Sequence, residues 1–310
     1  AHTLPQQGIW VRMASGDDIE ALEAEIDDRT KAIFCESIGN PAGNVIDIPL
    51  LSEMAHRHGI PVIVDNTVPT PYLCRPFDHG ADIVVHSLTK YIGGHGTTIG
   101  GIIVESGNFP WKDNPRFPQF NIPDPSYHGV IYADASDVPF ILRARVVPLR
   151  NMGAALSPFN AFNILQGLET LALRMERHVE NAISIATHLQ NHDRILWVNY
   201  AGLQEDRYHS LAKKICSGKP SAIISFGIEG GEKSGTRFID ALKMIKRLVN
   251  IGDAKTLACH PASTTHRQLR DEELKRAGVT SDLVRISVGI EHVDDIIADI
   301  DQALAAAMSS

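Results

Sequence analysis

The sequence predicts an α/β protein with a mostly parallel sheet flanked by helices, followed by a smaller C-terminal α/β domain. In the first third of the chain, short runs rich in Val and Ile alternate with segments that carry apolar residues at helical spacing. Strands that alternate with helices form parallel sheets covered on both faces. The alternation returns after residue 220, and 310 residues are enough for two cores. We therefore expect a large domain over residues 1–165, and a linking helix with a small domain over residues 166–310.

The elements expected in the large domain follow in a regular order. Apolar residues at helical spacing predict a helix over residues 19–26, behind the caps Ser15 and Asp17, and a second helix that ends at Gly59. Apolar runs predict four strands, at residues 32–36, 61–65, 82–86 and 101–104. Residues 106–150 are rich in Pro, Asn and aromatic residues and show little periodicity, so we expect an irregular excursion there, at a subunit contact.

The second half of the chain carries longer helical patterns. Residues 160–192 predict one long helix or a pair of helices that leads into the small domain. Strands are expected at residues 221–226 and 283–288. Helices are expected over residues 238–249 and 293–304, where apolar residues recur at a spacing of three or four.

Composition excludes several classes of protein. A formal net charge of -8 argues against a nucleic-acid partner, which would need clustered Lys and Arg. No apolar run is long enough to cross a membrane, and no signal peptide opens the chain. The 4 cysteines lie far apart, which favours a reducing cytoplasm over a disulfide framework. The 14 histidines show no ligand spacing, so no metal is expected.

Three of the predicted strands end in polar residues, at Glu36–Asn40, at residues 65–67 and at residues 86–90. The carboxyl ends of parallel strands are where α/β proteins bind ligands, so we expect one site from all three. Taken singly, Asp65 could be a cap and Lys90 a surface lysine. Together they suit pyridoxal phosphate (PLP), an electron sink that needs a lysine for its aldehyde and a carboxylate for its ring nitrogen.

On this interpretation, Lys90 forms the Schiff base and Asp65 keeps the ring nitrogen protonated. Ser87 and Thr89 flank the lysine and can donate to the phosphate. Arg285 lies in a predicted apolar strand, where it either pairs with a buried acid or holds a substrate carboxylate. Residues 250–253 and 260–266 are expected to be loops that could wall the same pocket.

Several of these runs together resemble the trans-sulfuration enzymes of Cys/Met metabolism, which are PLP enzymes of fold type I, the aspartate-aminotransferase-like transferases. The runs are Glu36-Ser-Ile-Gly-Asn-Pro41, Val64-Asp-Asn-Thr67, His86-Ser-Leu-Thr-Lys90, Gly252-Asp-Ala-Lys-Thr-Leu257, His260-Pro-Ala-Ser-Thr-Thr-His266 and Arg285-Ile-Ser-Val-Gly-Ile-Glu291. They occur in order over nearly the whole chain. Residues 93–97, 108–111 and 126–129 resemble the branch of O-acetylhomoserine sulfhydrylases. The Gly-His-Ser-Asp type of segment, usual after the lysine in cystathionine γ-synthases and γ-lyases, is not found here.

The resemblance implies roles for individual residues. Lys90 is the Schiff-base lysine and proton shuttle, and Asp65 pairs with the pyridine nitrogen. Asn40 and Arg285 bind the substrate α-carboxylate, with Asn40 also close to the cofactor's phenolic oxygen, and Thr67 lies near the ring. The implied reaction is γ-replacement, in which acetate leaves an O-acylhomoserine and sulfide or a thiol adds, giving homocysteine or methionine.

The resemblance also leaves alternatives. These are cystathionine γ-synthase or γ-lyase activity and, from another class, a catalytically silent assembly subunit or inactive fragment. A cytoplasmic homo-oligomer, a dimer-based tetramer, is expected. Val68 stands where the family more often has an aromatic residue. The family's upstream segment, with its phosphate loop and stacking tyrosine, has no counterpart in the sequence. The large domain is therefore expected to be N-terminally incomplete, and these residues alone are expected to bind PLP weakly.

Overall fold

The N-terminal half of the chain is built on a four-stranded sheet. A computed structural model describes residues 3–261 and 280–308. The strands of this sheet are β1 (Ile33–Glu36), β2 (Val62–Asp65), β3 (Ile83–Ser87) and β4 (Gly101–Glu105). They lie in the order β1-β2-β3-β4, with β1, β2 and β3 parallel and β4 antiparallel to β3. All four predicted strands are confirmed within one residue at either end.

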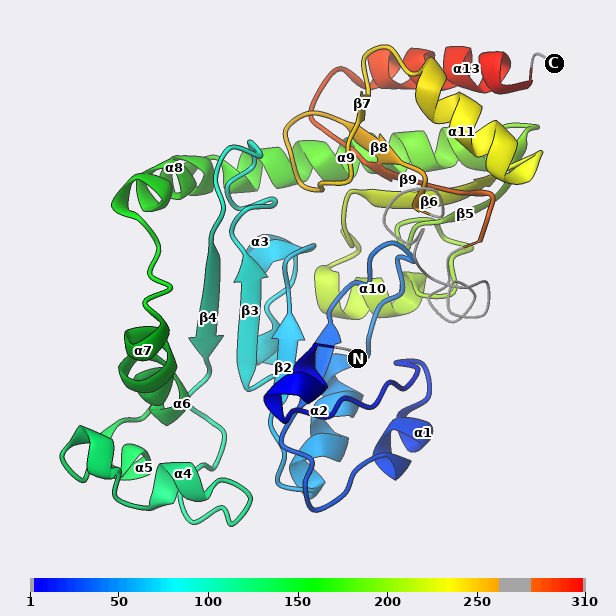
Figure 1. Cartoon of the computed structure of the whole chain (residues 1–310). Helices are drawn as coiled ribbons and strands as arrows, with labels where there is room; N and C mark the ends of the chain where they lie inside the picture. Colours follow the sequence, from blue (N-terminus) through cyan, green and yellow to red (C-terminus); the bar gives the residue numbers. More distant parts are fainter. Residues whose placement is uncertain (1–2, 262–279, 309–310) are drawn as a thin grey trace.

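Short helices surround this sheet (Figure 1). They are η1 (Leu4–Gln7), α1 (Ile19–Ala24), α2 (Ile48–Arg57), α3 (Thr70–Leu73) and η2 (Pro76–His79). In α2, Asp47 accepts the backbone N–H of Leu50 at 3.1 Å, which satisfies a donor that the helix leaves free. Asp18, and not Ser15 or Asp17, caps α1 in the same way, through the N–H of Ala21.

Residues 106–150 hold short helices around an aromatic cluster. The elements are α4 (Pro118–Asn121), η3 (Pro125–Tyr127), α5 (Tyr132–Ala135), α6 (Pro139–Ala144), the π-helical turn η4 (Arg145–Leu149) and α7 (Arg150–Met152). Phe109, Trp111, Phe117 and Phe120 pack together and are buried. Glu105 is buried beside them and accepts the indole N–H of Trp111 at 2.7 Å. The expected irregular excursion therefore has a core of its own.

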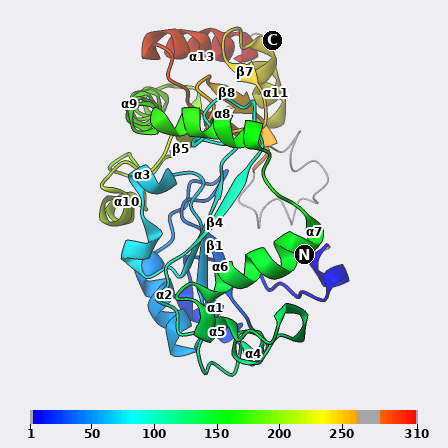
Figure 2. The same cartoon turned by 90° about the vertical axis from the view of Figure 1, so that its left-hand side faces the viewer.

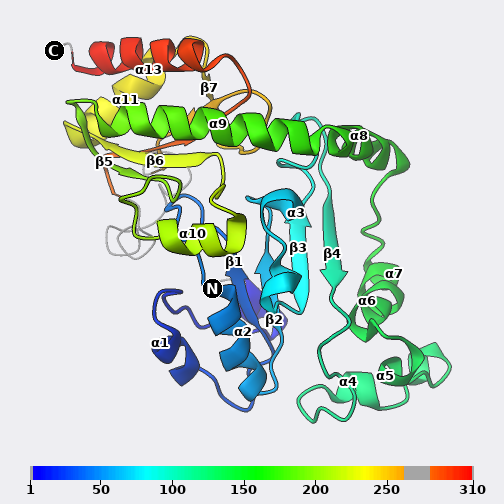
Figure 3. The same cartoon turned by 180° about the vertical axis from the view of Figure 1, so that it is seen from behind.

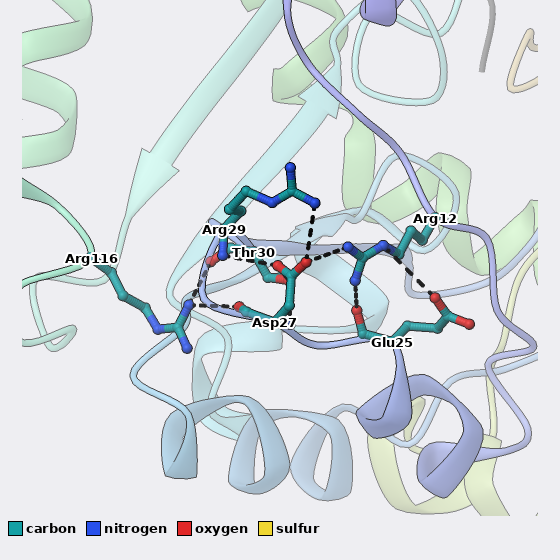
Figure 4. Close-up of polar contacts among 6 residues, drawn as sticks. All are labelled: Arg12, Glu25, Asp27, Arg29, Thr30 and Arg116. Carbon is teal, nitrogen blue, oxygen red and sulfur yellow. Dashed lines mark hydrogen bonds and ion pairs between the residues drawn. The ribbon is translucent and has the colours of Figure 1, made fainter.

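Arg116 anchors this excursion to the segments that precede β1 and β2. Its guanidinium donates to the carbonyls of Asp27 and Thr30 at 2.9 and 3.1 Å, and to the carbonyl of His58 at 2.9 Å. The carboxylate of Asp27 in turn binds the guanidinium of Arg12 (Figure 4). That hydrogen bond is the main reason why the pKa of Asp27 lies well below its usual range. Chain segments far apart in the sequence are thus joined at one edge of the molecule.

The C-terminal half is built on a second, five-stranded sheet. Its strands are β5 (Ile195–Asn199), β6 (Ile223–Ile228), β7 (Lys246–Arg247), β8 (Leu257–Cys259) and β9 (Leu283–Ser287). Their order is β5-β6-β9-β8-β7, and every neighbouring pair is antiparallel except β7 and β8. The helices are α9 (Leu171–Gln190), α10 (His209–Cys216), α11 (Gly231–Ala241) and α13 (Val293–Met308). Seen from behind, α9, α11 and α13 lie over the same face of this sheet (Figure 3).

The predicted helical region 160–192 is a pair of helices, α8 (Pro158–Glu169) and α9, separated at Thr170. An extended stretch of chain separates α7 from α8 (Figure 2), and α8 lies beyond β4, on the side away from the second sheet (Figure 1). The proposed domain boundary at residue 165 falls inside α8 and stays a prediction. Among the described residues, no helix is long and apolar enough to span a membrane.

The helix predicted over residues 238–249 is wrong in its second half. Helix α11 ends at Ala241, and residues 246–247 form β7. The carboxylate of Asp299 accepts the backbone N–H groups of Lys243, Met244 and Ile245 at 2.9, 2.9 and 2.8 Å. Because these donors point at Asp299, they cannot continue the helix, and the chain turns into the sheet.

Candidate active site

The polar ends of β1, β2 and β3 meet at one edge of the first sheet, as the sequence predicts. Glu36 and Asp65 are neighbours in the parallel ladder between β1 and β2. The Oδ1 atom of Asp65 accepts the N–H of Thr67 at 2.9 Å, and the Oγ1 atom of Thr67 accepts the N–H of Ser87 at 2.8 Å. Asp65, Thr67 and Ser87 therefore lie side by side, all half-buried.

Lys90 lies in a tight turn that follows β3. The N–H of Lys90 donates to the carbonyl of Ser87 at 3.2 Å, and the N–H of Gly94 donates to the carbonyl of Lys90 at 2.8 Å. Gly94 has a φ of 72°, a conformation that favours glycine. The Lys90 amine is half-buried, and it donates to Oδ1 of Asn250. Burial, followed by the positive charge of Arg285, lowers the pKa of Lys90, which increases the fraction of free amine.

Arg285 brings the second sheet to the same place. It lies on β9, and only 5% of it is exposed. Its guanidinium donates to Oδ1 of Asn40 at 3.1 Å, to the carbonyl of Asn250 at 3.1 Å and to the carbonyl of Val249. No acid pairs with Arg285 within residues 3–261 and 280–308, and its expected role at a substrate carboxylate stays a prediction. The structure thus brings Asn40, Lys90 and Arg285 together.

The hydroxyl groups of Ser87 and Thr89, both expected to bind phosphate, differ in their hydrogen bonds. The hydroxyl of Ser87 makes no hydrogen bond with a described residue. The Oγ1 atom of Thr89 accepts the N–H of Gly100 at 3.1 Å and donates to its carbonyl at 3.3 Å. Thr89 therefore closes the turn around Lys90 in this structure, and its expected role at a phosphate stays a prediction.

Loops of the small domain complete the site. The loop at residues 250–253 contacts the Lys90 turn through Asn250. From the run 260–266, His260 and Pro261 are described, and residues 262–266 lie outside the described residues. Among described residues, no group of three or more His, Cys, Asp and Glu is placed to hold a metal ion.

Arg174 was not expected from the sequence; it lies on α9 and supports the Lys90 turn. Only 5% of it is exposed. Its guanidinium donates to the carbonyls of Tyr91, Ile92 and Gly167, at 2.6, 3.1 and 2.6 Å. Burial lowers its pKa. A basic residue on the apolar face of a predicted helix is the only sequence signal that could have drawn attention to it.

The polar groups of this edge fit the cofactor that the sequence predicts. The Oδ2 atom of Asp65 has no hydrogen-bond partner among the described residues, which leaves it free for a protonated ring nitrogen. The Nε atom of Arg285 is buried and also lacks a partner in the described part of the chain. A buried donor without a partner is costly, and a substrate carboxylate would supply the missing acceptor. The amine of Lys90 contacts Asn250, which also binds Arg285, and its lowered pKa suits attack on an aldehyde.

The chain is similar in sequence to proteins of a known enzyme family. The family model for Cys/Met metabolism PLP-dependent enzymes matches residues 1–305. A homocysteine synthase from Schizosaccharomyces pombe is 52% identical over 308 residues, which are 98% of this chain and 72% of the relative. An O-acetyl-L-homoserine sulfhydrylase from Thermus thermophilus is 48% identical over 306 residues, with the same shares covered.

Two solved structures share the fold. One is a putative O-acetylhomoserine (thiol)-lyase from Campylobacter jejuni with N'-pyridoxyl-lysine-5'-monophosphate. It is 44% identical, with a TM-score of 0.95 over 98% of this chain and 73% of that one. The other is cystathionine γ-lyase from Lactobacillus plantarum complexed with L-serine, 30% identical with a TM-score of 0.82 over 99% of this chain and 72% of that one. The expected fold type and cofactor are confirmed, and the chain belongs to the family of Cys/Met metabolism PLP-dependent enzymes.

Proposed function

We propose that the chain catalyses γ-replacement on O-acetyl-L-homoserine with sulfide or a thiol, giving L-homocysteine or L-methionine and acetate. The names of the relatives support this, since homocysteine synthase and O-acetyl-L-homoserine sulfhydrylases are 46% to 52% identical to nearly the whole chain. The observation in the structure that carries the proposal is that Lys90 and Arg285 both contact Asn250, while Arg285 also contacts Asn40.

We assign the recognition of the substrate to Arg285 and Asn40. The Nε–H of Arg285 has no acceptor among the described residues and can donate to an α-carboxylate, while the terminal N–H groups of the guanidinium are directed to Asn40, Val249 and Asn250. The side chain of Asn40 already lies against this guanidinium. The α-carbon of a substrate held in this way is presented to the amine of Lys90, which contacts the neighbouring Asn250.

We assign the movement of protons to Lys90. Its lowered pKa provides free amine, which can remove the Cα proton and then transfer protons at Cβ, so that acetate leaves from Cγ. Bound pyridoxal phosphate would supply the electron sink that accepts the pair left at Cα. Asp65 would keep its ring nitrogen protonated, Thr67 would lie beside the ring, and Ser87 and Thr89 would hold its phosphate.

Cystathionine γ-lyase or γ-synthase activity is the second candidate, because the cystathionine γ-lyase structure shares the fold at 30% identity. The higher identity to sulfhydrylases favours the first. Product analysis separates them: O-acetylhomoserine with sulfide should yield homocysteine, whereas cystathionine or cysteine alone should yield little product.

The test of the proposed function is Lys90→Ala, with Lys213→Ala on the exposed side of α10 as the control. Lys90→Ala should lose both the visible absorbance of lysine-bound pyridoxal phosphate and homocysteine formation, while Lys213→Ala should keep both. Sulfide-dependent activity at the wild-type level in Lys90→Ala would overturn the assignment of Lys90.

We also propose a cytoplasmic homo-oligomer, a dimer-based tetramer. Apolar side chains on α8 support it, because Phe159 and Leu165 are 72% and 58% exposed, and large exposed apolar patches mark interfaces. Four cysteines without a disulfide suit a reducing compartment. Light scattering after size exclusion measures the mass, and a monomer at micromolar concentration would contradict the oligomer.

A further inference from the structure

Asn250 lies between the two charged groups of the site and contacts both. Its side-chain oxygen Oδ1 accepts a hydrogen bond from the amine of Lys90. Its main-chain carbonyl accepts a hydrogen bond from Arg285 at 3.1 Å. One residue of a loop therefore links the lysine of the first sheet to the arginine of the second.

The chemistry of the Asn250 side-chain amide determines which of its atoms faces Lys90. An ammonium group can only donate, so the oxygen of the Asn250 amide must face Lys90. An oxygen acceptor stabilises the ammonium form, whereas the nearby guanidinium of Arg285 destabilises it. Asn250 thus opposes Arg285 in setting how much of the Lys90 amine is free.

The loop that carries Asn250 is locked against the Lys90 turn. The N–H of Ala254 donates to the carbonyl of Gly94 at 2.8 Å, and the N–H of Gly252 donates to Oγ of Ser287 at 2.9 Å. A Cβ on Gly252 would lie 2.5 Å from the backbone nitrogen of Tyr91, so the two segments are in close contact there. Asn250 is therefore held at a fixed place relative to Lys90.

We propose that Asn250 is a positioning residue for Lys90: its side-chain oxygen holds the Lys90 ammonium group beside Arg285. The proposal rests on the role assigned to Lys90 in the proposed function. The new element is that the Lys90 amine keeps a hydrogen-bond partner within the protein, and does not turn into solvent, when it is not bonded to the cofactor. The side-chain oxygen is the atom that matters, since it binds the amine.

Two substitutions of nearly equal size test this. Asn250→Leu removes the acceptor, and Asn250→Asp puts a negative charge in its place. In the cofactor-free chain, the rate at which a small acylating reagent labels Lys90, measured by peptide mass spectrometry over a pH series, reports the fraction of free amine. At pH 8, the labelling rate should rise about threefold or more in Asn250→Leu and fall about threefold or more in Asn250→Asp. A change of one unit in the pKa of Lys90 changes the ratio of free amine to ammonium about tenfold, so a shift of about half a unit is enough for this effect.

The opposite directions separate positioning from general damage. A loosened fold would expose Lys90 and speed labelling in both variants, and that result, or equal rates in all three proteins, would overturn the proposal. Asn108→Leu and Asn108→Asp, at an exposed position after β4, are matched controls and should leave the labelling of Lys90 unchanged. If circular dichroism shows that Asn250→Leu is unfolded, Asn250→Ala replaces it, with the same expected direction.

The labelling experiment needs neither cofactor nor substrate. If the chain lacked sulfhydrylase activity, the two opposite shifts would still show that Asn250 holds the amine. If Asn250 had no effect on labelling, the loss of activity in Lys90→Ala would still support the proposed function. The failures of the two proposals are therefore distinguishable.

Discussion

Arg174→Met should destabilise the chain strongly, because Arg174 satisfies several buried acceptors at once. It binds three main-chain carbonyls, two of them at 2.6 Å, and the hydroxyl of Thr170 at 3.1 Å. Methionine fills the space but donates nothing. A buried acceptor without a partner costs about 1–3 kcal/mol. The carbonyl of Gly167 still accepts the N–H and the hydroxyl of Thr170, so the carbonyls of Tyr91 and Ile92 are the two that lose their donor. At the lower end of that range they cost about 2 kcal/mol together, since removal of the desolvated guanidinium offsets part of the cost.

The assay is a urea titration followed by circular dichroism, with Arg177→Met as the control. Arg177 lies on the same helix, but it is exposed and its partner is Glu180, at 3.5 Å on the surface. Its substitution should change the free energy of unfolding by no more than about 0.5 kcal/mol. A loss below about 1 kcal/mol in Arg174→Met would refute the reasoning, since the carbonyls would then have found other partners. Because Tyr91 and Ile92 follow Lys90 directly, the substitution should also weaken cofactor binding.

Three further changes follow from the structure. Asp65→Asn should reduce homocysteine formation about 100-fold or more while the urea midpoint stays the same, because a fixed charge opposite the ring nitrogen is lost. Burial lowers the pKa of His178 from 6.5 to about 4, so the unfolded chain takes up the proton first as the pH falls. The stability that His178 contributes should be complete above pH 6.5 and should decline toward pH 4, by up to about 3 kcal/mol. The free energies of unfolding of wild type and His178→Phe, measured by urea titration over a pH series, should therefore diverge between pH 6.5 and pH 4. Parallel curves would contradict the prediction. Glu105→Gln should cost about 2 kcal/mol in the same titration, since one acceptor for Trp111 and the backbone of α6 becomes a donor; an unchanged midpoint would count against it.

The strand ends were predictable because they depend on short-range patterns. Each apolar run has a defined last residue, and parallel strands place their carboxyl ends at one edge, so Asp65 and Ser87 had to lie close together. The contacts of Lys90 and Arg285 with Asn250 were not predictable, because they join segments 160 and 35 residues apart in the sequence. The loop was expected near the site, but no pattern indicates which of its side chains points inward.

Long-range contacts also explain why the helix over residues 238–249 was predicted too long and why Arg174 was not expected. Apolar residues at helical spacing after Ala241 predicted more helix, and the carboxylate of Asp299 on α13 took the N–H groups that the helix needed. Arg174 escaped notice because its partners are main-chain carbonyls, which every residue has. A sequence shows where side-chain chemistry is available, and it does not show which backbone groups the fold leaves unsatisfied.

Helix α9 has a consequence for how the molecule unfolds. Along one buried side, Arg174 holds the Lys90 turn, His178 donates to the carbonyl of Val288 at 2.6 Å, and Asn181 donates to the carbonyls of Gly289 and Glu291 at 3.0 and 2.9 Å. Helix α9 therefore holds both the segment that carries Lys90 and the segment that follows Arg285. The two sheets should therefore melt in one cooperative transition, and neither half should survive as a native remnant once α9 has come loose.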